Sequence, residues 1–274
     1  MTFFHAFILG IIQGLTEFIP VSSTAHLLIG QWLLNLPSNG RMFSFHVIIQ
    51  LGTVLALLLF FWKDFRLIVQ DFFGGIWRKK PFETHDAVLG WLLIVATLPA
   101  LIVGFLLKDI LDMLFRNPIL LAGIRLMMSA ILLAAVEYFG RHQRKLESAS
   151  WMDAFAVGMF QIISIFPGAS RSGSTIAGAI TRGFDRPSAA RFAFLMSAPI
   201  LLAAGAYETL HVIQSDGYAE FLPYLAVGFV TAAVVGWFSI KWLLEFLQRH
   251  SLYIFAAYCA LIGLLCFVLS LFQG

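Results

Sequence analysis

Charged side chains are scarce in this sequence: Asp, Glu, Lys and Arg make up 12% of its 274 residues, while hydrophobic residues make up 60%. The mean hydropathy of +0.87 lies far outside the range of a water-soluble domain of ordinary composition. The isoelectric point of about 9 does not indicate a nucleic-acid-binding protein, because the basic residues follow the loops between apolar runs. The composition predicts an all-α polytopic membrane protein.

Cysteine is also rare, and no leader sequence is recognisable. Cys259 and Cys266 lie in one apolar run without His or acidic neighbours, so we expect them to pack rather than bind a metal or form a disulfide. No basic start followed by a small-residue cleavage site precedes residues 2–12, so no removable signal peptide is expected.

Six apolar runs are long enough to cross roughly 30 Å of hydrocarbon. They lie near residues 42–62, 87–107, 118–139, 189–209, 222–245 and 252–272. Two further apolar segments, about 1–36 and 151–184, are each interrupted by a polar loop that contains proline, which predicts two re-entrant helix–loop–helix hairpins. We expect residues 1–274 to form a single integral membrane domain.

The basic residues predict the orientation. Placing the loops 63–86, 140–150, 182–191 and 246–250 on one side gathers twelve of the eighteen Lys and Arg residues there, and the positive-inside rule makes that side cytoplasmic. Both termini then lie outside, on the periplasmic side if the cell is Gram-negative, and the two hairpins enter from opposite sides. Because IPVSS at 19–23 resembles FPGAS at 166–170, we interpret the hairpins as parts of an inverted repeat.

The first polar motif is QGLTEFIPVSSTAH at residues 13–26. Gln13 and Glu17 are four residues apart and share a helical face, and Pro20 ends that helix. An ionised carboxylate inside a membrane is costly and usually marks a site, so Glu17 is predicted to be functional. Three hydroxyl residues follow the break, either as N-caps of the next helix or as site residues: Ser22, Ser23 and Thr24.

A histidine lies one helical turn beyond these hydroxyls. His26 is three residues after Ser23, where its imidazole would reach the Ser23 hydroxyl as a base or acid, although a hydrogen-bonded structural histidine fits the pattern too. Three residues of the first full span are secondary candidates for lining the cavity: Ser44, His46 and Gln50.

The second polar motif, PGASRSGST at residues 167–175, places a flexible backbone, hydroxyls and one guanidinium between two apolar helices. This combination is typical of anion binding, and it involves Gly168, Ser170, Arg171, Ser172 and Gly173. If the two loops meet at mid-membrane, Arg171 opposes Glu17, either in the site or as a structural ion pair. The other deep cations, Arg125 and Lys241, have no polar cluster around them, and we expect snorkelling or a local partner.

Together the two motifs identify a resemblance. The pattern (E/Q)xxxE, PVSSTxH and PGxSRSG, with FHVIIQLGTVLALLLFFWKD at 45–64 and RPSAARFAFLMSAPI at 186–200, resembles the BacA-type undecaprenyl-diphosphatases over the whole chain. The chain departs from the usual motif at Gln13, where the family allows Glu or Gln, and at Ala25 and Ala169, where Gly and Thr are common. Gln13 is therefore not a general base.

The resemblance implies a bacterial plasma-membrane (inner-membrane) phosphatase that hydrolyses undecaprenyl diphosphate and recycles the lipid carrier for peptidoglycan synthesis. In the expected mechanism Ser23 attacks the distal phosphorus, Glu17 or His26 takes its proton, and Arg171 with Ser170 and Ser172 holds the phosphoryl oxygens. A phosphohistidine at His26 or a water activated by Glu17 are alternatives. The family implies a divalent cation, Mg²⁺ or Ca²⁺, with Glu17 and Gln13 as ligands.

A flippase or secondary transporter is the competing function, because inverted broken-helix hairpins also build transport sites. The combination of Ser, His, Glu and Arg favours an enzyme. Hydrolysis of the substrate outside would need the cavity of the first hairpin to face outward, so we expect the site to open to that side. The expected partners are a polyprenyl diphosphate and the bilayer, with no nucleic acid, and the sequence leaves open whether the chain forms a homo-oligomer.

Overall fold

Six long helices form the membrane-spanning part of the protein. The computed structural model describes residues 1–107, 117–165, 170–214 and 218–272, and in these ranges it is helical without a β-sheet. The helices long and apolar enough to cross a bilayer are α3 (Gly40–Phe60), α5 (His85–Leu106), α7 (Pro118–Phe139), α10 (Arg186–Ile213), α11 (Tyr218–Leu247) and α12 (Tyr253–Leu271). The predicted all-α membrane fold is confirmed.

Local sequence explains where several spans begin. Each of four spans starts after a polar side chain that accepts a hydrogen bond from a backbone N–H of the first turn: Asn39, Thr84, Asn117 and Asp185. Pro118 and Pro187 follow two of these caps, in the first turn where proline costs no hydrogen bond. The caps supply the hydrogen bonds that the first turn of a helix cannot make internally.

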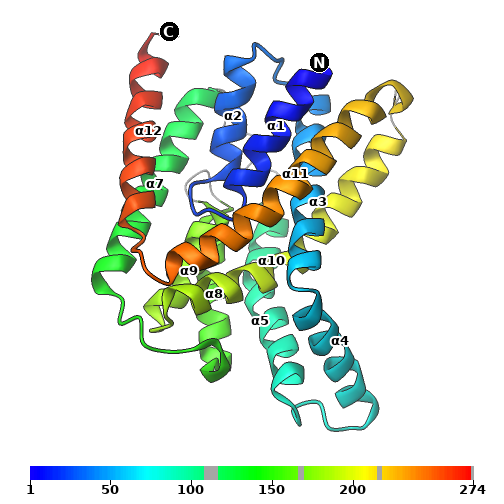
Figure 1. Ribbon diagram of the computed structural model, residues 1–274, viewed down its shortest axis with the longest axis vertical. Coiled ribbons are helices and arrows are strands. Elements are labelled where there is room, and N and C mark those ends of the chain that lie inside the picture. The colour runs from blue at the N-terminus through cyan, green and yellow to red at the C-terminus, as the bar shows by residue number, and fades with distance from the viewer. Residues whose placement is uncertain (108–116, 166–169, 215–217, 273–274) are drawn as a thin grey trace.

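The two predicted hairpins are present and inverted. The first consists of α1 (Phe3–Thr16) and α2 (Ser23–Leu33), and the second of α8 (Trp151–Ile163) and α9 (Arg171–Thr181). At 1.5 Å per residue, the 11 residues of α2 or α9 extend about 16 Å, roughly half the thickness of a bilayer core. Figure 1 shows α1 and α2 descending from the end that carries both termini, while α8 and α9 rise from the opposite end.

Helix packing repeats across the two halves of the chain. The first hairpin packs through α1 on α11 of the second half, and the second hairpin packs through α8 on α5 of the first half. Small residues permit both close approaches: an added Cβ at Gly14 would lie 2.7 Å from Val235 Cβ, and one at Gly158 would lie 2.6 Å from Ala96 O. The segments GIIQ at 10–13 of α1 and GMFQ at 158–161 of α8 share the pattern Gly-x-x-Gln.

The segment after α3 differs from the prediction. Residues 63–86 were expected to form a loop, but Trp62–Trp77 form a helix, α4, that packs on α5 and projects with it beyond the rest of the bundle (Figure 1). The charged residues of this segment lower its hydropathy, yet they occupy one face of the helix. On the other face Ile68 is buried, and the ring centroids of Phe72 and Trp91 are 4.8 Å apart. The loop expectation was wrong because amphipathic periodicity, rather than mean hydropathy, determines this helix.

Many of the cations at the end opposite the termini are paired. Asp153 of α8 accepts from Arg144 Nη2 and Arg182 Nε, both at 2.7 Å, and so joins the segment before α8 to the C-terminus of α9. Three further pairs hold neighbouring elements together: Lys145 with Asp185, Arg186 with Glu137, and Arg191 with Asp64. Ion pairing at this end therefore joins α8 to α9 and to the segment before it, and joins α10 to α7 and α4.

Candidate active site

The first hairpin breaks over Glu17–Ser22, between α1 and α2. The backbone of Ser22 has φ of 68°, a left-handed conformation that is unusual for a residue with a side chain. This turn aims the N-terminus of α2 back towards the second hairpin. Ser22 occupies the N-cap position, but its hydroxyl makes no capping hydrogen bond, so the interpretation of Ser22 as a cap alone is wrong.

Glu17 is the centre of the site. Its Oε2 accepts from Ser23 Oγ at 2.7 Å and from Gln13 Nε2 at 2.9 Å. Its Oε1 accepts from Arg171 Nη2 at 2.5 Å and from Gln50 Nε2 at 3.0 Å. The carboxylate side chain is 2% exposed, and these four donors come from α1, α2, α3 and α9. A buried carboxylate in a membrane interior needs such partners to replace the hydrogen bonds that it loses with water.

The second hairpin brings Ser170, Arg171 and Ser172 to the same place. Ser170 caps α9 by accepting from Gly173 N at 3.2 Å, and its hydroxyl lies 3.1 Å from that of Ser172. Ser172 Oγ donates to the carbonyl of Ile19 in the first hairpin at 3.4 Å. The two loops therefore meet, as predicted. The predicted residue Gly168 lies outside the described residues.

A cavity of about 180 Å³ lies between the two hairpins. Its lining comes from both broken loops and three spans: Glu17, Ser22, Ser23, Thr24, Gln50, Arg125, Ser164, Ser170, Arg171, Ser172 and Leu201. The N-termini of α2 and α9 both contribute residues, and helix N-termini carry a partial positive charge that favours anions. Hydroxyls, backbone donors and guanidinium groups suit a phosphate group.

Arg125 is a site residue that sequence reasoning missed. It was expected to snorkel or to have a local partner, but it lines the cavity from α7, and its Nε is buried without a hydrogen-bond partner in the part of the chain that the structure describes. The side chain lies at the hairpin contact in the interior of the bundle, and no other polar residue precedes Ser129 in its span to signal this from sequence. An arginine deep within a span was the only available signal.

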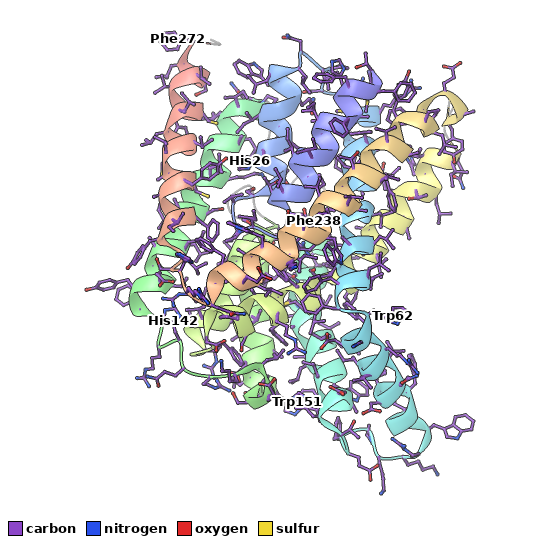
Figure 2. All side chains as sticks on the ribbon, viewed as in Figure 1. His26, Trp62, His142, Trp151, Phe238 and Phe272 are labelled. Carbon is purple, nitrogen blue, oxygen red and sulfur yellow. The ribbon has the colours of Figure 1, made fainter. Side chains whose placement is uncertain are left out.

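The predicted contact between the His26 imidazole and the Ser23 hydroxyl does not form. Its Nδ1 lies 2.9 Å from the carbonyl oxygen of Ser22, and its Nε2 lies 2.8 Å from the hydroxyl of Tyr258 on α12. The imidazole stacks on the Tyr258 ring, and Figure 2 shows His26 on α2 at the side towards α7 and α12. Ser23 instead donates to Glu17. A catalytic role for His26 stays a prediction, and its observed contacts hold the strained Ser22 turn.

The three secondary candidates for lining the cavity lie in three different places. Gln50 belongs to the site through its hydrogen bond to Glu17. Ser44 donates to Glu208 at 2.6 Å, away from the cavity. His46 lines a separate cavity of about 570 Å³ between α2, α3 and α7, and its Nε2 is buried without a described partner.

The described residues do not form a metal site by themselves. They contain no cluster of three or more His, Cys, Asp or Glu side chains that could hold a metal ion. Both Glu17 oxygens already accept hydrogen bonds, and Gln13 turns its amide N–H, rather than its carbonyl oxygen, towards Glu17. Mg²⁺ and Ca²⁺ require oxygen ligands, so the predicted Glu17–Gln13 pair does not fit a cation in this arrangement.

Comparison with known proteins gives consistent matches along the chain. The family described as "Bacitracin resistance protein BacA" matches residues 6–265. The undecaprenyl-diphosphatase of Myxococcus xanthus is 40% identical over 269 residues, covering 98% of this chain and 89% of the relative. That of Desulforudis audaxviator is 40% identical and covers 99% of both chains. That of Thermomicrobium roseum is 38% identical and covers 96% of both.

Proposed function

The chain belongs to the BacA family of bacitracin resistance proteins, and from this premise we propose how its mid-membrane site hydrolyses undecaprenyl diphosphate. The chain is a multi-pass membrane phosphatase that converts undecaprenyl diphosphate to undecaprenyl phosphate and inorganic phosphate. This reaction recycles the lipid carrier for peptidoglycan and cell-envelope synthesis. The residue roles that follow are our proposal, and the Ser23–Glu17 hydrogen bond carries it.

Ser23 is the proposed nucleophile. A serine hydroxyl is a weak nucleophile until a neighbouring base removes its proton, and Ser23 Oγ donates directly to Glu17 Oε2 at 2.7 Å. Ser23 attacks the distal phosphorus, its proton passes to Glu17, and the bond between that phosphorus and the bridging oxygen breaks. Undecaprenyl phosphate leaves, and water then hydrolyses the phosphoserine to inorganic phosphate and restores the Ser23 hydroxyl.

Arg171 and the N-terminus of α9 are proposed to bind the transferring phosphoryl group. Arg171 Nη2 holds Glu17, but Nη1 is buried without a hydrogen-bond partner among the described residues and is free to donate to a phosphoryl oxygen. Ser170 and Ser172 lie beside it at the start of α9. Phosphoryl transfer depends mainly on positioning and on charge stabilisation of the equatorial oxygens, which these donors supply.

A divalent cation is proposed to take part only together with substrate. Because the Glu17–Gln13 pair does not form a metal site alone, a bound Mg²⁺ or Ca²⁺ needs phosphate oxygens as most of its ligands. Such an ion would add positive charge beside the phosphates. We therefore expect chelation to affect turnover and to leave the thermal stability of the substrate-free protein unchanged.

The site is proposed to open towards the end that carries the termini, which we assign to the outside. The cavity of about 570 Å³ lies towards that end, on the helices that line the site. Its residues Leu28, His46 and Leu121 are each four positions, about one helical turn, from the site residues Thr24, Gln50 and Arg125. The stacked cavities support a route for the diphosphate head group from the outer side.

The decisive experiment measures phosphate release from undecaprenyl diphosphate by purified protein in detergent, with Mg²⁺ and with EDTA. Ser23→Ala and Glu17→Gln are expected to lose turnover by about 100-fold or more. Ser197→Ala is a matched control, because this buried hydroxyl donates only within α10, to the Phe194 carbonyl. Retained turnover in folded Ser23→Ala would exclude the serine mechanism.

Trapping the covalent intermediate separates the possible nucleophiles. Rapid acid quenching of enzyme with substrate labelled in the distal phosphate should give an acid-stable phosphoserine at Ser23. An acid-labile adduct at His26 would establish the phosphohistidine alternative. No labelled protein, with turnover intact, would favour a water activated by Glu17.

A further inference from the structure

Arg125 is a cation at the cavity for which the described residues provide no counter-charge. It lies about two turns inside α7, and no described acidic group forms an ion pair with it. Glu17 is the carboxylate among the lining residues, and it already pairs with Arg171 at 2.5 Å. The lining thus carries two guanidinium groups and one carboxylate. An unpaired guanidinium inside a membrane is costly, and such groups usually face a site or pathway.

The backbone of α7 is fixed to the second hairpin next to Arg125. Ser170 N donates to Ser129 Oγ at 2.9 Å, and Ser129 Oγ donates to the carbonyl oxygen of Arg125 at 2.8 Å. This chain of hydrogen bonds joins the N-cap of α9 to the turn of α7 that carries Arg125. The guanidinium therefore enters the cavity from a fixed position on α7, while Arg171 enters from α9.

We propose that Arg125 binds the second phosphate of the substrate, the one that stays on the lipid. This inference rests on the proposed function of the site. Ser23 and Arg171 both contact Glu17, so the transferring phosphate belongs beside them. A diphosphate carries a second anionic group, and the Arg125 guanidinium, with its buried and unpartnered Nε, supplies a second set of donors in the same cavity.

Arg125 would be placed to stabilise the negative charge that develops on the leaving group during the reaction. When Ser23 Oγ bonds to the distal phosphorus, the bond from that phosphorus to the bridging oxygen breaks, and the electron pair remains on the departing lipid monophosphate. Arg125 stabilises the added negative charge on that monophosphate, while the Ser23 proton moves to Glu17. Arg125 therefore selects diphosphates, because a lipid monophosphate has no second phosphate to offer it.

The experiment compares Arg125→Met and Arg171→Met in purified protein, with farnesyl diphosphate as substrate and methylenediphosphonate and inorganic phosphate as inhibitors. Arg125→Met should raise the KM for farnesyl diphosphate and the inhibition constant of methylenediphosphonate by about 10- to 100-fold. It should change the inhibition constant of inorganic phosphate by less than about twofold, whereas Arg171→Met should weaken the binding of both inhibitors. Arg125→Lys should recover part of the lost binding, because it restores the positive charge but not the planar arrangement of donors that a guanidinium provides.

The matched control is Lys241→Met, which removes a cation from the exposed face of span α11. This control should keep the wild-type constants. Arg125→Met should unfold at the same temperature as wild type or higher, because it removes an uncompensated charge. The inference is overturned if Arg125→Met keeps both the wild-type KM for farnesyl diphosphate and the wild-type inhibition constant of methylenediphosphonate. It is also overturned if Arg125→Met weakens the binding of inorganic phosphate as strongly as the binding of methylenediphosphonate.

Failure of the proposed function gives a different result. If wild type releases no phosphate from either lipid diphosphate, the hydrolytic mechanism fails. Protection of the protein from thermal unfolding by methylenediphosphonate would still test Arg125 as a diphosphate ligand. Protection that is equal in wild type and Arg125→Met would then reject the inference on its own.

Discussion

At the scale of single residues, Glu17 is the centre of the proposed chemistry, because each donor to its carboxylate has a different consequence. In the proposed mechanism Ser23 gains a base, while Arg171 is oriented across the contact between the hairpins, and Gln13 and Gln50 contribute neutral donors without adding charge. The four donors satisfy both oxygens of the buried carboxylate. Since Arg171 is also one of those donors, the same guanidinium both holds the base and faces the cavity.

Arg171→Lys is expected to reduce kcat/KM by about 10- to 100-fold. A lysine ammonium keeps the charge but cannot hold Glu17 through one nitrogen while presenting another rigidly to phosphate. Steady-state phosphate release measures the effect. Arg141→Lys is the matched control, an exposed arginine in the loop between α7 and α8. Wild-type activity in Arg171→Lys would mean that the site needs only a positive charge at this position.

Sequence patterns predicted the members of the site better than their contacts. The cost of burying Glu17 and Arg171 in an apolar segment was sufficient to predict their pairing. The orientation of His26 was not predictable, because helical spacing places it near Ser23 while tertiary packing turns its ring to Tyr258 of α12. Arg125 was missed for the same reason, since the residues that surround it come from other elements of the chain.

At the scale of elements, close helix contacts hold the hairpins in position. Helix α1 lies against α11 because Gly10 and Gly14 allow their backbones to approach, and α8 lies against α5 through Gly158. Hydropathy predicted the six spans to within a few residues. These interhelix contacts could not be predicted, because glycine spacing does not identify which helix approaches.

Gly14→Ala is expected to destabilise the protein by about 1–3 kcal/mol, as overpacking does in a close-packed interior. The added Cβ would lie 2.7 Å from Val235 Cβ and 2.9 Å from Ala232 O, so α1 or α11 must shift. Gly40→Ala is the matched control, because a Cβ there meets no atom within 4 Å. Thermal unfolding in detergent measures both, and equal midpoints for the two variants would contradict the proposed packing constraint.

The ion network at Asp153 gives an expected pH dependence. Burial favours the protonated form of Asp153, but hydrogen bonds from Arg144, Arg182 and Ser150 outweigh this effect and hold its pKa below the ordinary value of 3.8. A lowered folded-state pKa means that the stabilisation is complete above the ordinary value and is lost as the pH falls through the folded-state pKa. Wild type should therefore lose thermal stability as the pH falls below about 4.

Asp153→Asn separates this network from other acid effects. The variant should be less stable than wild type at pH 7, and the difference should narrow as the pH falls below 3.8, the ordinary value for this carboxyl. Unfolding midpoints across this range measure the difference. A gap between the two proteins that does not depend on pH would show that Asp153 stabilises the hairpin without its charge.

At the scale of the whole molecule, the inverted repeat connects the orientation with the chemistry. Both termini and the first hairpin lie at one end, and the second hairpin enters from the other, where ion pairs join it to the segment before α8 (Figure 1). The 30-residue α11 extends about 45 Å, longer than the bilayer core, and runs obliquely across the bundle (Figure 1). The broken helices remain in the interior, where protein groups satisfy their exposed backbone.

The orientation predicts which loops a membrane-impermeant thiol reagent reaches in intact cells. In a background of Cys259→Ala and Cys266→Ala, Ser38→Cys lies between α2 and α3 at the end that carries the termini, and Glu147→Cys lies at the opposite end. Both native residues are exposed, so the comparison tests sidedness rather than burial. By the positive-inside rule, Ser38→Cys should react in intact cells and Glu147→Cys only after permeabilisation. The opposite pattern would place the opening of the site, and the release of phosphate, on the cytoplasmic side. Ser38 lines the cavity of about 570 Å³ that we propose as the route to the site, so the side on which Ser38→Cys reacts is the side on which that route opens.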